Sequence, residues 1–163
     1  MGKAIMLRIL VFECLLLACC GYALWKGGPP ERIVGGSLLL AYAATLASYS
    51  SYAERFVHVE TRILLVDMVL LAVLVAVALR ADRGWPIILA GLQLDTVGAH
   101  LLKNWDLDMI RVTYAVMIAA WSYPMVIVLA LGTWRHAARL RRHGYDVSWI
   151  PLDGHDQAAS RLR

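Results

Sequence analysis

Charged side chains are scarce in this sequence. Asp, Glu, Lys and Arg make up only 17% of its 163 residues, whereas 60% belong to the hydrophobic set. Ordinary soluble domains contain roughly a quarter charged and about half apolar residues. A deficit of this size argues against a free cytoplasmic enzyme.

The sequence also lacks the short motifs that supply catalytic chemistry. It contains no His-Glu-x-x-His, no Gly-x-Ser-x-Gly, no phosphate-binding loop and no dinucleotide fingerprint. Metal-dependent hydrolysis, serine hydrolysis and nucleotide binding therefore lack their usual residues. We expect no catalytic residue, no metal site and no enzymatic activity.

Cysteines are few and lie close together, at Cys14, Cys19 and Cys20. None has a partner elsewhere in the chain, so a disulfide framework is not expected. Residues 16–19 follow a basic start and a short apolar run, which resembles a bacterial lipoprotein cleavage box. Glu13 within that run, and the apolar stretches that follow, favour a retained first span.

Long apolar stretches dominate the sequence instead. Five stretches without Lys or Arg hold between 17 and 23 residues each. Because about 20 mostly apolar residues cross a bilayer as a helix, they predict an all-α polytopic membrane protein whose five transmembrane helices form a compact bundle within residues 1–134. The predicted spans cover about 5–25, 33–53, 63–80, 85–103 and 111–134. Residues 135–163 are predicted to extend the last helix as far as Gly144 and to continue as a short basic tail.

The distribution of basic residues predicts the orientation. The tail and the first and third loops together hold 10 of the 16 Lys and Arg residues. Basic residues accumulate on the cytoplasmic side of a membrane, so the C-terminus is predicted to be cytoplasmic and the N-terminus outside. Tryptophans favour membrane interfaces, and Trp25, Trp85, Trp105 and Trp134 lie at predicted span ends.

Two clusters of helix-breaking residues predict tight hairpins. Residues 26–32 join the first two spans and residues 80–86 join the third and fourth, and both contain glycine and proline. Pro86 suits the first turn of the fourth helix, where no backbone N–H is needed.

A few polar side chains interrupt the predicted spans. Ionisable groups in hydrocarbon are costly and are functional candidates by default. We expect an intramembrane cluster in the middle-to-outer part of the bundle, with the fourth span packed centrally because its polar residues point in two directions. The expected members are Glu13, Asp67, Gln93, Asp95, Thr96 and His100.

Three interpretations of this cluster are open. The first is a hydrogen-bonded layer that fixes which helices pack together. The second is a proton or cation path that uses the intramembrane acids, and the third is a redox subunit that binds haem or quinone. In the haem interpretation His58 and His100 are the candidate axial ligands, because they are predicted on the same side of the membrane and imidazole binds haem iron.

The residues after Trp134 form a basic helical run. Arginines next to a span attract anionic lipid at about 1 kcal/mol each, so lipid headgroups are predicted partners and nucleic acid is not. The candidate headgroup-binding residues are Arg135, Arg139, Arg141 and Arg142. His136 and His143 belong to the same run and are expected to be solvated. An apolar segment at 148–152 is expected on the membrane surface or against a partner.

The residues 25–32, together with the runs Trp121–Pro124 and Leu131–His136, resemble small bacterial inner-membrane proteins to which no activity is assigned. The likeness covers most of residues 5–149. It implies the bacterial cytoplasmic membrane and no catalytic residue.

Short loops leave little room for an aqueous active site. We therefore expect a non-catalytic accessory or assembly subunit that associates with other membrane protein subunits or with copies of itself, without a cofactor. The alternatives are a small proton- or cation-linked transporter and the haem- or quinone-binding redox subunit.

Overall fold

The computed structural model describes residues 2–50, 58–105, 111–146 and 149, and the described chain is built from helices. The five helices are α1 (Gly2–Lys26), α2 (Pro29–Ser50), α3 (His58–Arg80), α4 (Trp85–Trp105) and α5 (Arg111–His143). Each contains most of one apolar stretch, so the all-α prediction is confirmed. Two segments, Met6–Lys26 and Thr61–Arg80, are long and apolar enough to cross a membrane.

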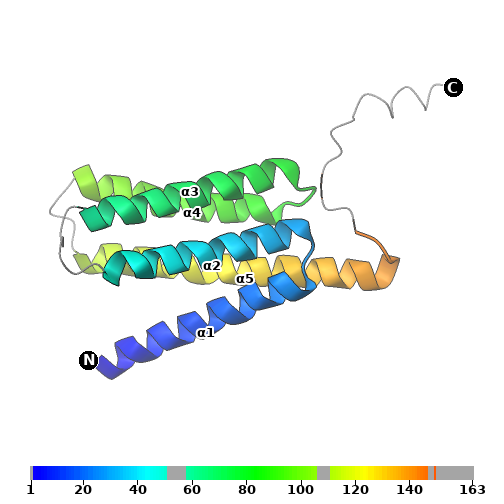
Figure 1. Ribbon diagram of the computed structural model, residues 1–163, viewed down its shortest axis with the longest axis horizontal. Coiled ribbons are helices and arrows are strands. Elements are labelled where there is room, and N and C mark those ends of the chain that lie inside the picture. The colour runs from blue at the N-terminus through cyan, green and yellow to red at the C-terminus, as the bar shows by residue number, and fades with distance from the viewer. Residues whose placement is uncertain (1, 51–57, 106–110, 147–148, 150–163) are drawn as a thin grey trace.

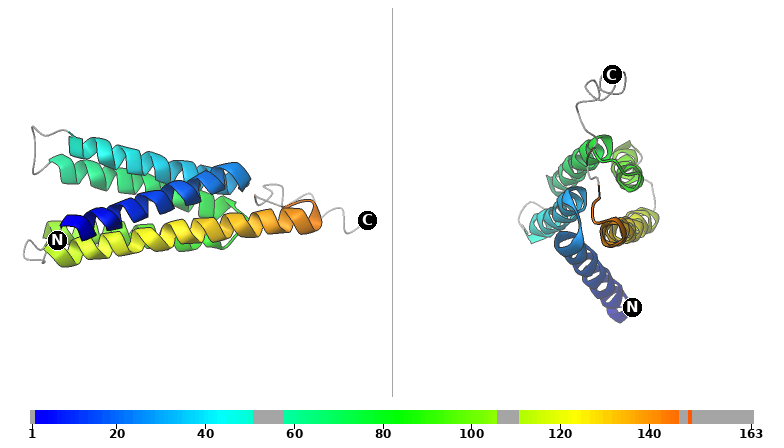
Figure 2. Two further views of the ribbon diagram at one scale, coloured as in Figure 1. Left: turned by 90° about the horizontal axis from the view of Figure 1, so that it is seen from below. Right: turned by 90° about the vertical axis from the view of Figure 1, so that its right-hand side faces the viewer.

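The helices pack around the bundle in chain order. Each helix contacts the next one, α5 returns to contact α1, and α2 touches α5 across the middle. Helix α1 runs obliquely, with its end beside α2 and its start away from α2 (Figure 1, Figure 2). The N-terminal half of α1 contacts α5 instead. The Tyr123 hydroxyl of α5 donates to the Arg8 carbonyl at 3.3 Å, and the rings of Tyr123 and Phe12 meet edge to face.

An apolar core fills the bundle. Leu74, Leu89 and Leu129, from α3, α4 and α5, are completely buried. They are joined by Leu16 and Cys20 of α1, Val34 and Leu38 of α2, Leu70 and Val77 of α3, and Met125 and Val126 of α5. All five helices therefore contribute to one core.

The turn between α1 and α2 is fixed by glycines. A Cβ on Gly27 would lie 2.3 Å from the Ala23 carbonyl oxygen and 2.5 Å from the Glu31 Cβ, so only glycine fits. The Gly27 carbonyl accepts a hydrogen bond from Arg32 Nε at 3.0 Å. Helix α2 begins at Pro29, as a proline in the first turn allows. The glycine-proline cluster therefore makes the predicted hairpin.

Helix α5 has 33 residues and ends where the sequence predicts, before Gly144. Gly144 adopts a φ of 75°, which is typical of the residue after a helix, and its N–H bonds to the Leu140 carbonyl at 3.0 Å. The chain then turns back, and Trp149 forms an isolated antiparallel bridge with Ala81 and packs against the core. Trp149 thus packs on this chain itself, whereas its segment was expected on the membrane surface or against a partner. Residues 147–148 and 150–163 lie outside the described residues.

The tryptophans at the helix ends differ in their surroundings. Trp25 and Trp134 are exposed. Trp85 is partly buried, and its ring lies so close to Gly132 of α5 that a Cβ there would be 2.9 Å away. Trp85 therefore joins α4 to α5, and the side chain of Trp105 lies outside the described part.

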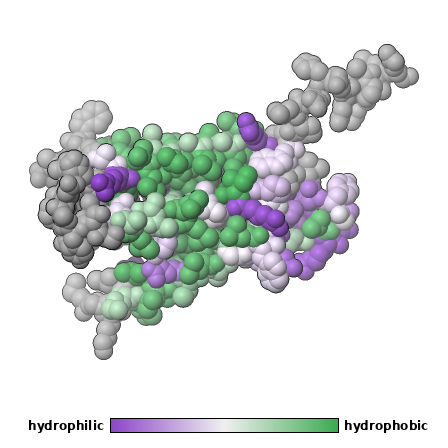
Figure 3. Space-filling model, in the orientation of Figure 1, coloured by the Kyte–Doolittle hydropathy of each residue, from purple (hydrophilic) through white to green (hydrophobic). Residues whose placement is uncertain are grey.

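Large apolar side chains are exposed on every helix, for example Leu10, Leu40, Met68, Leu94 and Leu131. In Figure 3 apolar residues cover the middle of the visible face, and hydrophilic residues gather beyond it at the end of α5. On this face the apolar middle and the hydrophilic end of α5 are therefore distinct.

Candidate functional site

Three of the predicted polar residues meet between α3 and α4. The Gln93 amide donates to Asp67 Oδ1 at 3.0 Å and also approaches the Asp67 backbone carbonyl at 3.3 Å. His100 Nε2 lies 3.1 Å from Asp67 Oδ2. Gln93 and His100 are seven residues apart, so two turns of α4 present both to the one carboxylate. Both Asp67 oxygens thereby have a partner.

Thr96 lies on the same stretch of α4 and is buried, but its hydroxyl bonds back to the Leu92 carbonyl at 3.2 Å. Glu13 belongs to a separate pair, because it accepts a hydrogen bond from the Tyr42 hydroxyl at 2.6 Å. This pair joins α1 to α2. The polar residues therefore form two interhelical contacts, and the expected single cluster of all the acids is wrong.

Asp95 is a second correction. It is exposed on the outer side of α4, and α4 packs only against α3 and α5 within the described chain. The side chains around it on that surface, Ile88 and Leu94, are exposed as well. The expectation that α4 packs on two neighbours is confirmed, since α4 contacts α3 and α5. Only the Gln93 side of α4 faces a neighbour, however, and the expectation that Asp95 also does so is wrong.

The structure describes the side chain of only one of the two candidate haem ligands, His100. His100 Nε2 is engaged with Asp67. His58 is the first residue of α3, and its side chain lies outside the described part. The residues that the structure describes include no group of three His, Cys, Asp or Glu side chains placed to hold a metal ion.

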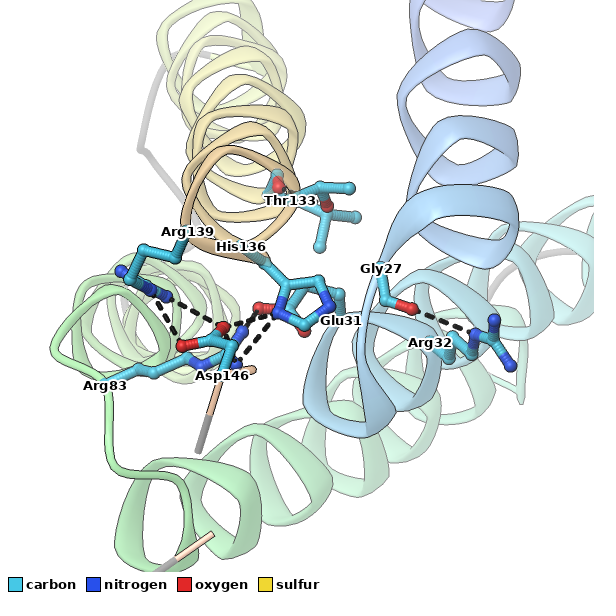
Figure 4. Close-up of polar contacts among 9 residues, drawn as sticks. Gly27, Glu31, Arg32, Arg83, Thr133, His136, Arg139 and Asp146 are labelled. Atoms are coloured by element: carbon cyan, nitrogen blue, oxygen red, sulfur yellow. Dashed lines mark hydrogen bonds and ion pairs between the residues drawn. The ribbon is translucent and has the colours of Figure 1, made fainter. Parts of the chain in front are cut away.

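A larger polar site lies at the opposite end of the bundle, where the α1–α2 turn, the α3–α4 turn and the end of α5 meet (Figure 4). Arg83 and Glu31 form an ion pair there in which both side chains are almost completely buried. Arg83 also donates to Asp146 Oδ2 at 2.6 Å. We call this set of five residues the turn-end cluster: Glu31, Arg83, His136, Arg139 and Asp146.

Asp146 is the acceptor on which the turn-end cluster converges. Arg139 Nε donates to its Oδ1 at 2.8 Å, and His136 Nδ1 contacts its Oδ2. The same His136 nitrogen, Nδ1, also lies 3.1 Å from Arg83 Nη2, so the imidazole stands between the guanidinium and the carboxylate. Two guanidinium donors, Arg83 and Arg139, together with the His136 imidazole thus surround one carboxylate from the segment after α5.

The charges around Asp146 also act on its protonation. Burial alone would raise the pKa of Asp146, but hydrogen bonds from Arg139 and His136, together with the charges of Arg83 and Arg139, outweigh that effect. The pKa of Asp146 is therefore held below its ordinary value, and the carboxylate stays charged near neutral pH.

Gly28 closes the other side of the imidazole. A Cβ on Gly28 would lie 3.0 Å from His136 Cε1, 3.2 Å from Nε2 and 3.1 Å from Glu31 Oε2. Glu31 Oε2 is buried and accepts no hydrogen bond from the described residues. The backbone at Gly28 thus lies close to both the imidazole and the carboxylate, and a larger residue at position 28 would require these side chains to shift.

The predicted headgroup-binding arginines divide into two kinds. Arg135, Arg141 and Arg142 are exposed on α5, whereas Arg139 holds Asp146 with its side chain 43% exposed. His143 is exposed as expected, but His136 is only 7% exposed, so its expected solvation is wrong. A polar surface depression of about 420 Å³ adjoins the turn-end cluster and is lined by Asp82, Arg139, His143, Tyr145 and Asp146.

The apolar core separates the two polar regions. Along α3, Leu70 and Leu74 lie between Asp67 and the turn-end cluster, and Leu89 occupies the same interval on α4. No chain of polar side chains connects the regions through the described core.

The turn-end cluster was not among the predicted sites, because nothing in the sequence pattern pairs Glu31, Arg83 and Asp146. One signal was present: opposite charges occur in both hairpin turns on the side predicted for the tail.

No family model, no curated protein and no solved structure matches this chain.

Proposed function

We propose that the chain is a five-span protein of the bacterial cytoplasmic membrane, with its N-terminus outside and its C-terminus in the cytoplasm. It acts as a non-catalytic accessory or assembly subunit of a larger membrane protein complex. The membrane placement is supported by the two apolar helices Met6–Lys26 and Thr61–Arg80 and by the exposed apolar side chains on all five helices. Even the shortest helix has 21 residues, about 31 Å at 1.5 Å per residue, which matches a hydrocarbon core of roughly 30 Å.

Burial of polar groups within the bundle supports the same placement. Gln93, Thr96 and Thr133 are buried in helices that would otherwise bring them to lipid, and the hydroxyls of Thr96 and Thr133 bond to carbonyls one turn earlier. Polar side chains in membrane bundles satisfy their hydrogen bonds in this way.

Asp95 is the observation that carries the accessory role. It lies at the middle of α4, and therefore at mid-depth of a spanning helix, yet it is exposed. A carboxyl group facing lipid at that depth is costly and almost always has a protein neighbour. Gly91 and Gly98 are on the same helix face, and a Cβ on either would meet nothing within 4 Å. This face suits a second helix that approaches closely and donates a hydrogen bond to Asp95.

A crosslinking experiment tests the accessory role. A photoreactive amino acid at Ile88, on the Asp95 face, is expected to give a discrete protein adduct in cells, and one at Leu40 of α2 is not. Both side chains are exposed, at 61% and 73%, so position rather than exposure decides the result. Asp95→Leu is expected to abolish the Ile88 adduct and to leave the helical content of the purified protein unchanged.

The contradicting result is equally specific. If Ile88 and Leu40 give only lipid adducts, and native gels show the same monomer for wild type and Asp95→Leu, the accessory role is wrong. Mass spectrometry of the adduct distinguishes another subunit from a second copy of the chain.

Transport and redox functions receive less support. Leu70, Leu74 and Leu89 separate the polar regions that a proton path would have to connect. The His100 imidazole, a candidate axial ligand of haem, already contacts the Asp67 carboxylate through Nε2. Asp95, the acid nearest mid-depth on α4, points away from the interior acids.

A further inference from the structure

We propose that Arg83, His136 and Arg139 form a binding site for a phosphodiester monoanion, and that Asp146 occupies this site from within the chain. A lipid headgroup is the source of the anion that best fits, and this part of the proposal rests on the membrane placement proposed above. The anion site itself does not.

The convergence of donors shows a built site. Arg83 Nη2 lies 2.6 Å and Arg139 Nη2 3.3 Å from the same Asp146 oxygen, Oδ2, which His136 Nδ1 also contacts. Arg139 Nε holds Oδ1 at 2.8 Å. Each guanidinium presents a planar fork of donors, which suits carboxylate and phosphate oxygens. The side chain of Arg83 is 97% buried, since only 3% of it is exposed.

The occupant is carried by a short segment that follows α5. Asp146 stands two residues after Gly144, whose positive φ turns the chain back toward the α3–α4 turn. Trp149 and Ala81 form the single backbone bridge that continues this contact among the described residues. Asp146 lies beyond the last helix, so displacement of this segment would uncover the two guanidiniums and the imidazole without unwinding any of the five helices.

The charge balance selects a monoanion. Without Asp146, Arg83 and Arg139 contribute two positive charges and Glu31 one negative charge, so these three side chains sum to +1. Asp82 lies at the rim of the adjoining depression and adds negative charge there. A phosphodiester carries one negative charge and matches the site, whereas a phosphate dianion meets repulsion from Glu31 and Asp82.

Access and position favour a lipid over a free anion. The depression of about 420 Å³ opens beside Arg139 and Asp146. Arg135, Arg141 and Arg142 are exposed on the same end of α5 and would attract an anionic leaflet. The site lies at the end of the helices, at the level of headgroups in the proposed placement.

The test compares wild type with Asp146→Asn, using the full chain in a mild detergent. The probes are dihexanoyl phosphatidylglycerol, dihexanoyl phosphatidylcholine and inorganic phosphate, with binding measured by calorimetry. An internal competitor lowers apparent affinity by the fraction of sites that it fills, so Asp146→Asn is expected to bind phosphatidylglycerol about tenfold more tightly. Phosphatidylcholine and phosphate are expected to show no such gain.

Arg139→Gln in the Asp146→Asn background should remove the gain, and the matched control Arg142→Gln, on the same helix but outside the cluster, should keep it. Circular dichroism checks that each variant retains its helices. Should Asp146→Asn misfold, Asp146→Ser and hydrogen exchange at residues 145–149 of the wild type, with and without phosphatidylglycerol, provide the same comparison.

Equal phosphatidylglycerol affinity in wild type and Asp146→Asn would overturn the proposal. An equal gain for inorganic phosphate would overturn both the lipid source and the selection of a phosphodiester, and would leave only a general anion site. The soluble probes bind without a bilayer, so these outcomes are separate from the membrane placement, which cell fractionation and carbonate extraction test independently.

Discussion

Glu31 is the side chain whose burial depends most on a partner. It is fully buried, and Arg83 is its ion-pair partner. A charge taken out of water costs several kcal/mol unless its partner is close and well placed. The pair fixes the α1–α2 turn against the α3–α4 turn, and its removal should therefore affect the whole end of the bundle.

We expect Glu31→Gln to lower the free energy of unfolding by about 3 kcal/mol, because it leaves a buried guanidinium with less compensation. Unfolding in mixed micelles by titration with sodium dodecyl sulfate measures this change. Asp82→Asn removes the same charge from an exposed position on the α3–α4 turn and should change stability little. Equal losses in the two variants would contradict a special role for the buried pair.

The pH dependence follows from Asp146. Its folded-state pKa is lowered, so its contribution to stability is present above the unfolded pKa of about 3.8 and is lost as pH falls through the folded value. We expect wild type to lose thermal stability as pH falls below about 4, and Asp146→Asn to lose less over the same range. A scan of the unfolding midpoint from pH 6 to pH 3 measures both. Parallel curves would show that Asp146 contributes nothing to acid sensitivity.

At the scale of elements, the contact between α4 and α5 depends on Gly132. A methyl group there would lie 2.9 to 3.0 Å from three atoms of the Trp85 ring. We expect Gly132→Ala to destabilise the bundle by about 1 to 3 kcal/mol through overpacking. Gly36→Ala is the matched control, since its Cβ meets nothing within 4 Å and alanine favours a helix. Thermal unfolding should move in opposite directions for the two variants.

The helices were predictable from the sequence, and their partners were less so. Long apolar stretches and glycine-proline turns depend on local composition, which explains why α1 to α5 begin and end near the expected residues. The end of α5 before Gly144 was predictable for the same reason, because a glycine after a helix is a local signal. Which way a polar residue faces depends on the neighbours that the helix acquires, and for this reason Asp95 was misplaced while Gln93 and His100 reached one acceptor.

The turn-end cluster shows the same limit among charges. Glu31, Arg83 and Asp146 are far apart in the sequence, and nothing in local periodicity pairs them. Their common side of the bundle was predictable from the alternation of spans. Their actual partners required the positions of two turns and the reversal of the chain after α5.

For the whole molecule, the proposed orientation makes a direct prediction. Fusion of a fluorescent protein after Arg163 should fluoresce, because that domain folds in the cytoplasm, whereas alkaline phosphatase at the same place should be inactive. Alkaline phosphatase inserted after Ser50 should be active, since the α2–α3 connection is predicted outside. The opposite pattern at both sites would show the inverted orientation.

The order of the helices around the bundle has a consequence for biogenesis. Because sequence neighbours are also spatial neighbours, α1 to α4 can associate one after another as the chain leaves the ribosome. Helix α5 then packs between α1 and α4 and closes the bundle. It also brings His136 and Arg139 to the turn-end cluster. In the proposed membrane placement, a chain that ended before α5 would leave the sides of α1 and α4 that face α5 uncovered, and the Glu31–Arg83 pair would lack His136 and Arg139 beside it.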